Sequence, residues 1–178
     1  MGIRIALAVA AAACLLAPAG ASAATDASTD TFNGTCAGMS GFVHWPDSTL
    51  TNTPGFKRML VEFDSGRCTG TLNGQPVTNA PGRLDGELQG IQACGGGLQT
   101  GRLQLTIDGV SIEADATYRR VLTAPTVVFD GDAGGSAIAV ARALIDLADS
   151  VRVCNGAGYS TVPIVVDEFR TAPQIASP

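Results

Sequence analysis

The chain has 178 residues, enough for one domain of ordinary size, and its 46% content of hydrophobic residues suits a packed core rather than a disordered chain. Its 16 acidic and 11 basic residues give a formal net charge of -5, which argues against a sequence-independent nucleic-acid binder, because contacts to phosphate require a basic face. The single histidine, His44, excludes any mechanism that needs two.

The N-terminal segment 1–24 is typical of a secretory signal peptide. Arg4 places a positive charge ahead of an uncharged apolar run over 5–17, which is too short to span a bilayer as a helix. The small residues of 21–23 then form the pattern that signal peptidase cleaves. We therefore expect a secreted, extracellular protein that begins at Ala24 or Thr25, with no transmembrane segment in the mature chain.

Cys14 leaves a second localisation open. The tetrapeptide Ala11-Ala12-Ala13-Cys14 is a loose lipobox, which would make the protein a cell-envelope lipoprotein anchored through Cys14. The first position of a lipobox usually holds leucine, and here the apolar run continues past Cys14. Both features favour secretion without a lipid anchor.

The mature chain is predicted to hold a flexible arm over 25–34, one β-rich domain over 35–170 and a C-terminal tail over 171–178. Within the domain, Gly, Asn or Pro recurs about every eight to twelve residues, as in a sandwich or barrel of short strands. Alternation of apolar and polar residues predicts strands at 58–64 and 102–107, and β-branched and aromatic residues predict two more at 126–129 and 162–169.

Two dipeptides predict tight turns. Asp108-Gly109 separates two alternating runs, and Asp-Gly suits the type I′ turn, which needs positive φ at both central residues. The strand after it should expose Ser111, Glu113 and other polar residues while burying the alternate set. Asn73-Gly74 is the second candidate for a hairpin turn.

The segment 136–151 allows two interpretations, because its apolar residues recur at helical spacing. It is either one helix, or a strand over 137–141 followed by a short helix near Leu144–Val153. We favour the second, because Gly134-Gly135 opens the segment as a hairpin would. The predicted fold is thus a single antiparallel β-sandwich or β-barrel with one short helix.

Four cysteines remain after removal of the signal peptide: Cys36, Cys68, Cys94 and Cys154. An even number in an exported domain indicates two disulfides, and four cysteines allow three connectivities. Sequential pairing, Cys36–Cys68 and Cys94–Cys154, is favoured because it closes local loops.

The candidate ligand-binding residues lie in one short motif, His44-Trp45-Pro46-Asp47. Trp45 could stack on a sugar or an apolar ring, and His44 or Asp47 could make polar contacts. The alternative is that the motif merely ends a strand with a partly buried tryptophan and a turn-forming aspartate.

Carboxylates supply the remaining chemical candidates. The pairs Glu62/Asp64, Glu113/Asp115 and Asp167/Glu168 could act in a hydrolase or lyase, although the first two pairs project from strand faces that we expect to be solvated. Asp130 and Asp132 open a segment that resembles the start of a calcium loop but lacks its later ligands. No cofactor is predicted.

The segments Thr35-Cys36-Ala37-Gly38, Asp130 to Ser136 and Val153-Cys154-Asn155-Gly156, together with the signal peptide, carry a resemblance. The chain resembles a group of small exported actinobacterial proteins with four cysteines, a β-rich body and a short helix before the last cysteine. The resemblance implies the fold but no catalytic residues.

Three functional hypotheses follow. The first is a non-enzymatic module that binds an extracellular ligand or protein. The second is a small carboxylate-dependent hydrolase or lyase, and the third is a β-barrel carrier of a small apolar ligand, which a cavity of a few hundred cubic ångströms would support.

Overall fold

The structure, a computed structural model, describes residues 29–121 and 124–177. The predicted signal peptide, residues 1–24, lies outside the described residues. The described elements are nine antiparallel strands and one helix: β1 (Asp30–Ala37), β2 (Met39–His44), β3 (Gly55–Leu72), β4 (Gln75–Ala93), β5 (Gly96–Ile107), β6 (Val110–Val121), β7 (Ala124–Gly131), β8 (Gly134–Ala143), α1 (Leu147–Cys154) and β9 (Thr161–Ser177).

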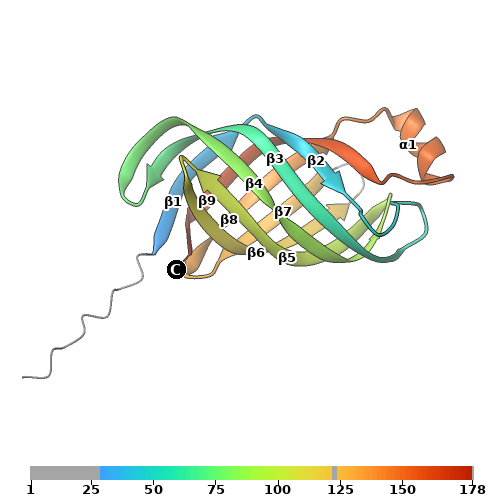
Figure 1. The fold of residues 1–178 in the computed structure, drawn as a ribbon, viewed down its shortest axis with the longest axis horizontal. Helices are drawn as coiled ribbons and strands as arrows, with labels where there is room; N and C mark the ends of the chain where they lie inside the picture. The colour runs from blue at the N-terminus through green and yellow to red at the C-terminus, as the bar shows by residue number, and fades with distance from the viewer. Residues whose placement is uncertain (1–28, 122–123, 178) are drawn as a thin grey trace, which may run out of the picture.

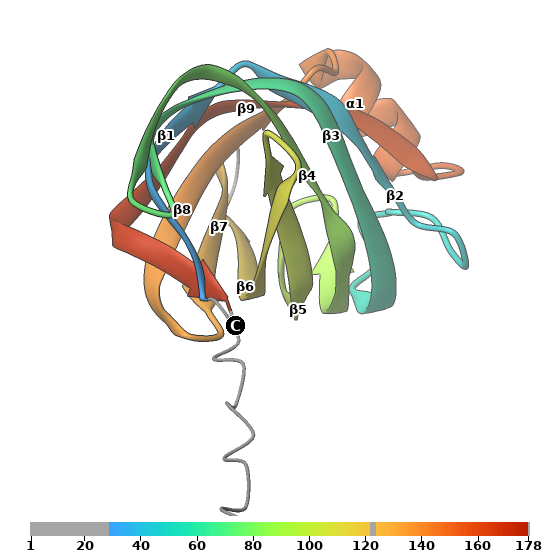
Figure 2. The ribbon, with the colours of Figure 1, turned by 60° about the vertical axis from the view of Figure 1, so that its left-hand side comes forward.

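The sheet closes on itself, so the fold is a barrel and not a sandwich (Figure 2). From β3 to β9 each strand pairs with the next along the chain, and β1 and β2 both lie between β3 and β9. Gly38, with a φ of 69°, separates β1 from β2, and the two strands share one position in the ring. Nine strands with one shared position give a barrel of eight positions.

The predicted hairpins are confirmed. Asp108 and Gly109, with φ of 49° and 85°, join β5 to β6, and Ile107 pairs with Val110. On β6 Ile112 is fully buried, while the neighbouring Glu113 is exposed, as the alternation predicted. Asn73-Gly74 forms the corresponding turn between β3 and β4.

Both ends of the domain were predicted wrongly. Residues 30–34, expected in the flexible arm, belong to β1, and residues 171–177, expected in the tail, belong to β9. The two segments pair with each other in the register Asp30↔Ser177 and Phe32↔Ile175, and the side chains of Phe32 and Ile175 are buried. Their polar outward residues resemble those of loops, and only the closed ring gives the few apolar residues a core to face.

The strand-then-helix interpretation of 136–151 is confirmed, with β8 ending at Ala143 and α1 beginning at Leu147. The helix starts later than predicted because the Leu144 amide still donates to the Pro163 carbonyl at 2.8 Å. Asp146 then caps the helix, and its carboxylate accepts from the Ala148 amide at 2.8 Å.

The disulfides have the favoured connectivity. Cys36–Cys68 joins directly paired positions of β1 and β3, and Cys94–Cys154 joins the end of β4 to the end of α1. They span 32 and 60 positions along the chain. In the chain-entropy model each contributes about 4 kcal/mol by restricting the unfolded chain.

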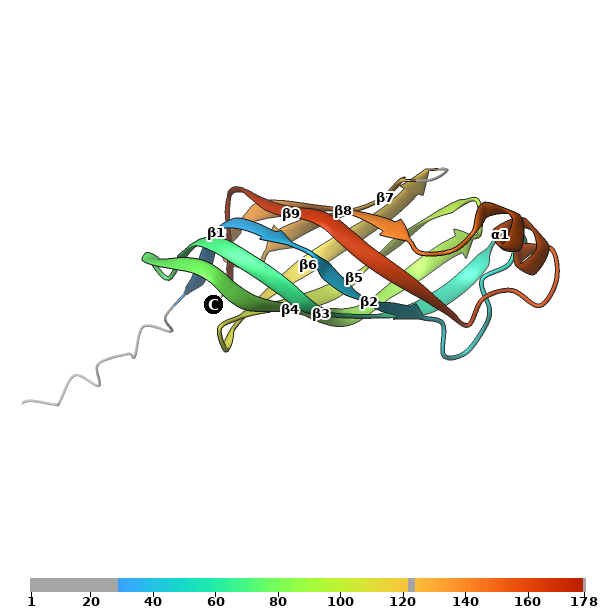
Figure 3. The same ribbon diagram turned by 90° about the horizontal axis from the view of Figure 1, so that it is seen from above.

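The two ends of the barrel differ (Figures 1 and 3). The hairpin end carries the turns at 73–74, 108–109 and 132–133, and the helix end carries α1 and the loop over 45–54. The hairpin half is filled by large side chains, including Phe32, Phe129 and Phe169, and the last two rings meet edge to face with centroids 5.3 Å apart. This half is therefore a packed core.

Replacing Phe169 by alanine should destabilise the barrel by about 3–5 kcal/mol, because it removes a fully buried ring and leaves a void. Urea unfolding followed by circular dichroism measures the loss. The matched control is Phe56→Ala, since Phe56 is 70% exposed on the outside of β3 and its loss should change stability by less than about 0.5 kcal/mol. Equal losses in the two variants would contradict this packing.

Candidate functional site

An apolar cavity lies inside the barrel at the helix end. Every strand position contributes to its wall, and representative lining residues are Val43, Val61, Leu88, Leu103, Ala139 and Ile164. None of the residues that line it is Asp, Glu, Lys, Arg or His. The cavity walls therefore offer little that would compensate a buried charge, and they favour an uncharged occupant.

The cavity exists because one strand carries small side chains. Where β3, β4 and β9 direct leucine, valine or isoleucine inward, β8 directs Ala139, Ala141 and Ala143 toward the same space. The room for the centre of a water-sized sphere is about 70 Å³, while all non-atomic space between the walls, crevices and mouth included, is about 870 Å³. The smaller figure is below the few hundred cubic ångströms expected for a carrier of an apolar ligand, so this conformation has room only for a smaller molecule.

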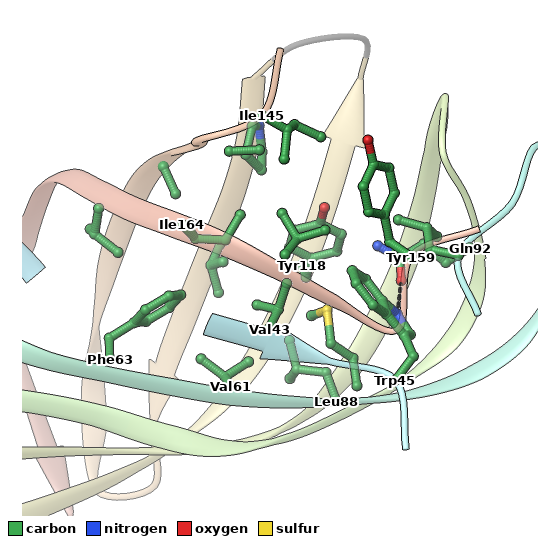
Figure 4. A pocket seen from close by; sticks show the side chains of 18 of the residues that line it. Val43, Trp45, Val61, Phe63, Leu88, Gln92, Tyr118, Ile145, Tyr159 and Ile164 are labelled. Atoms are coloured by element: carbon green, nitrogen blue, oxygen red, sulfur yellow. Dashed lines mark hydrogen bonds between the residues drawn. The ribbon is translucent and has the colours of Figure 1, made fainter. Parts of the chain in front are cut away.

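Trp45, one of the predicted binding residues, lines this cavity. Its side chain is 3% exposed, and its indole Nε1 donates to Oε1 of Gln92 at 2.9 Å (Figure 4). Gln92 is also buried and projects inward from β4 on the same side as Leu84 and Leu88. The pair forms a polar contact in a mostly apolar wall, which also includes the hydroxyl-bearing residues Tyr118, Ser150 and Tyr159.

The other two residues of the motif do not join Trp45. His44 is on the outside of β2, where its Nδ1 lies 3.0 Å from Thr161 Oγ1 and its Nε2 lies 3.8 Å from the Glu62 carboxylate. Asp47 is exposed and lies 3.6 Å from Arg58 on the outer surface. Successive residues of an extended chain point to opposite faces, which separates His44 from Trp45.

Two connected segments lie at the helix end of the barrel: the loop over 45–54, and the stretch from α1 to Tyr159. The chain's one lysine, Lys57, points inward, and its Nζ donates to the Thr49 carbonyl of the loop over 45–54 at 2.7 Å. Leu50 of that loop exchanges two backbone hydrogen bonds with Tyr159, at 2.7 and 3.0 Å. The Cys94–Cys154 disulfide ties the same region to the end of β4. The covering segments are thus fixed to the barrel and to each other.

Tyr159 is a lining residue that the sequence analysis did not single out. Its hydroxyl oxygen is buried, and within the described part of the chain it has no hydrogen-bond partner. In Figure 4 its hydroxyl points away from the Trp45–Gln92 hydrogen bond. Tyr159 precedes β9 in a connection without a regular sequence pattern, so the sequence gave no signal for its position. Gln92 could have been noticed, because it is a polar residue among the inward-facing positions of β4.

The candidate carboxylates lie on the outer surface, where each faces a cation or His44. Glu113 and Asp115 lie 2.9 and 3.7 Å from Arg102, and Asp167 lies 2.9 Å from Arg142. Asp64 lies 3.7 Å from Arg83, and Glu168 lies 3.9 Å from Arg170. The three predicted pairs therefore project into solvent and not into the cavity.

Of the two predicted calcium ligands, Asp132 is hydrogen-bonded to Arg102. Asp130 lies on β7, at the backbone position opposite Asp115 of β6. The hydrogen bonds to Asp132 and Glu113 raise the pKa of Arg102. Across the described ranges, no group of three or more His, Cys, Asp or Glu side chains is placed to hold a metal ion.

Among the described residues, one carboxyl group, on the outer surface, has a clearly lowered pKa. Arg58 donates to the Glu87 carboxylate at 2.8 Å, and this hydrogen bond lowers the pKa of Glu87 and raises that of Arg58. Both groups are solvated, and a lowered pKa keeps Glu87 ionised. This is the opposite of what a general acid requires.

No protein-family model matches the chain, and the searches of curated proteins and of solved structures found no match either. In the described part of the chain, no helix is both long and apolar enough to cross a bilayer.

Replacing Gln92 by methionine should destabilise the protein by about 1–3 kcal/mol, because it leaves the buried indole N–H of Trp45 without its acceptor. Trp45→Phe should also be destabilising. The double variant should lose less stability than the sum of the losses in the two single variants, since neither partner is then left unpaired. Strictly additive losses in urea unfolding would contradict the contact.

Proposed function

We propose that this chain is an exported, non-enzymatic binding protein whose barrel takes up a small apolar molecule in the cavity at the helix end. The observation that carries the proposal is the apolar void itself, enclosed by all strand positions of a closed ring. A barrel of eight positions is wide enough either to be filled by its own side chains or to hold one small ligand. In this protein side chains fill the hairpin half, and the helix half is left with room for a ligand.

The size of the void limits the ligand. An apolar cavity of about 150 Å³ takes up benzene or xenon, and the room in this one is about 70 Å³. A ligand of a few non-hydrogen atoms fits without rearrangement, and a single small ring fits if side chains of the wall adjust. A long lipid chain is too large for this conformation, so the proposal is a binder of small molecules.

Export is part of the proposal. The segment 1–24 has the features of a signal peptide, and two disulfides are typical of proteins that fold in an oxidising compartment. The outward position of the candidate carboxylates supports binding over carboxylate-dependent hydrolysis, because a glycosidase of that kind needs two such groups converging on a substrate.

A cavity-filling variant tests the proposal. Benzene should raise the unfolding temperature of the protein and change the emission of Trp45, the chain's one tryptophan, because it binds the folded state beside that ring. Ala139→Leu should abolish both effects by occupying the void. Val140→Leu is the matched control, since Val140 is 40% exposed on the outside of the same strand.

Calorimetric titration with benzene then gives the affinities of the three proteins. The proposal predicts equal affinity for the natural protein and Val140→Leu, and at least a tenfold weaker affinity for Ala139→Leu. Absence of binding to the natural protein, or unchanged binding to a folded Ala139→Leu variant, would remove it.

A further inference from the structure

We propose that the Tyr159 hydroxyl is the hydrogen-bond anchor of this cavity and that it selects small apolar molecules carrying one oxygen acceptor, such as a ketone. This inference rests on the proposed function, because it concerns the ligand of the same cavity. It gives the ligand a polarity that an apolar wall alone does not specify.

The first observation is the state of the hydroxyl. Its oxygen is buried, the residue lines the cavity, and the described residues provide no partner for it. Within the described ranges, two other buried side-chain oxygens share this state, those of Ser48 and Gln99, but neither residue lines the cavity. A buried hydroxyl that forms no hydrogen bond is unfavourable, and a ligand oxygen within reach would relieve this.

The second observation is that the side-chain oxygen of Gln92, which also lines the cavity, is already engaged. Gln92 Oε1 accepts from the Trp45 indole at 2.9 Å, so this contact is internal to the wall. The phenol O–H of Tyr159 remains able to donate, and a carbonyl oxygen is a suitable acceptor for it.

The third observation is that Tyr159 is held in place before any ligand binds. Its backbone exchanges hydrogen bonds with Leu50 in both directions, and the Asn52 amide donates to the Cys154 carbonyl at 3.0 Å next to the disulfide. An anchor fixed in this way needs little reordering when it binds, which favours discrimination between ligands.

The test compares two molecules of the same shape, cyclopentanone and methylenecyclopentane, which differ in having an oxygen or a CH₂ group on the ring. Their absolute affinities are not comparable, because water solvates the ketone more strongly. The informative quantity is the change that Tyr159→Phe causes in each affinity. This substitution removes one oxygen atom and leaves the backbone bonds to Leu50 intact.

We expect Tyr159→Phe to weaken cyclopentanone about five- to tenfold and to leave methylenecyclopentane unchanged or slightly tighter. The carbonyl stretching band of the bound ketone should lie at lower frequency in the natural protein than in the variant. If both molecules bind and the substitution affects them equally, the anchor is wrong while the apolar binding site stands. If neither binds the natural protein, the proposed function fails and the anchor with it.

Discussion

The pairing of the first two strands with the last is the constraint on which the rest of this structure depends. β1 and β2 are far from β9 in sequence, yet their pairing with it, at Phe32↔Ile175 and Val43↔Val162, closes the ring. Without it the inward faces of neighbouring strands would be open to water, and the row of unpaired backbone groups on β9 would be a sheet edge. The cavity is a property of the closed ring and has no counterpart in an open sheet.

Once the ring is closed, the volumes of the inward side chains decide where it is full and where it is empty. Phe129 and Phe169 fill the hairpin half, and the alanines of β8 leave room in the helix half. The covering loop and α1 are then attached by Lys57, the backbone of Leu50 and the Cys94–Cys154 bond. The cavity results from the same packing rules that build the core.

Features that depend on local chemistry were predictable from the sequence, and features that depend on ring closure were not. The Asp108-Gly109 turn and the Asp146-capped helix after β8 follow from residues close to them in the chain. Two features follow from a long-range pairing that leaves no local pattern. One is that the sheet closes into a barrel and not a sandwich, and the other is that residues 30–34 and 171–177 are strands. Of the three predicted binding residues, Trp45 lines the cavity. His44 and Asp47, which are close to it in sequence, lie outside the barrel.

The most direct test of the account is a crystal structure determined under xenon pressure, since xenon enters apolar voids and is located by its anomalous scattering. The account predicts a xenon atom inside a closed barrel, among Val43, Leu88 and Ile164 and near Ala139, with β1 and β9 paired. A helix half filled by repacked side chains, with xenon elsewhere or absent, would contradict it.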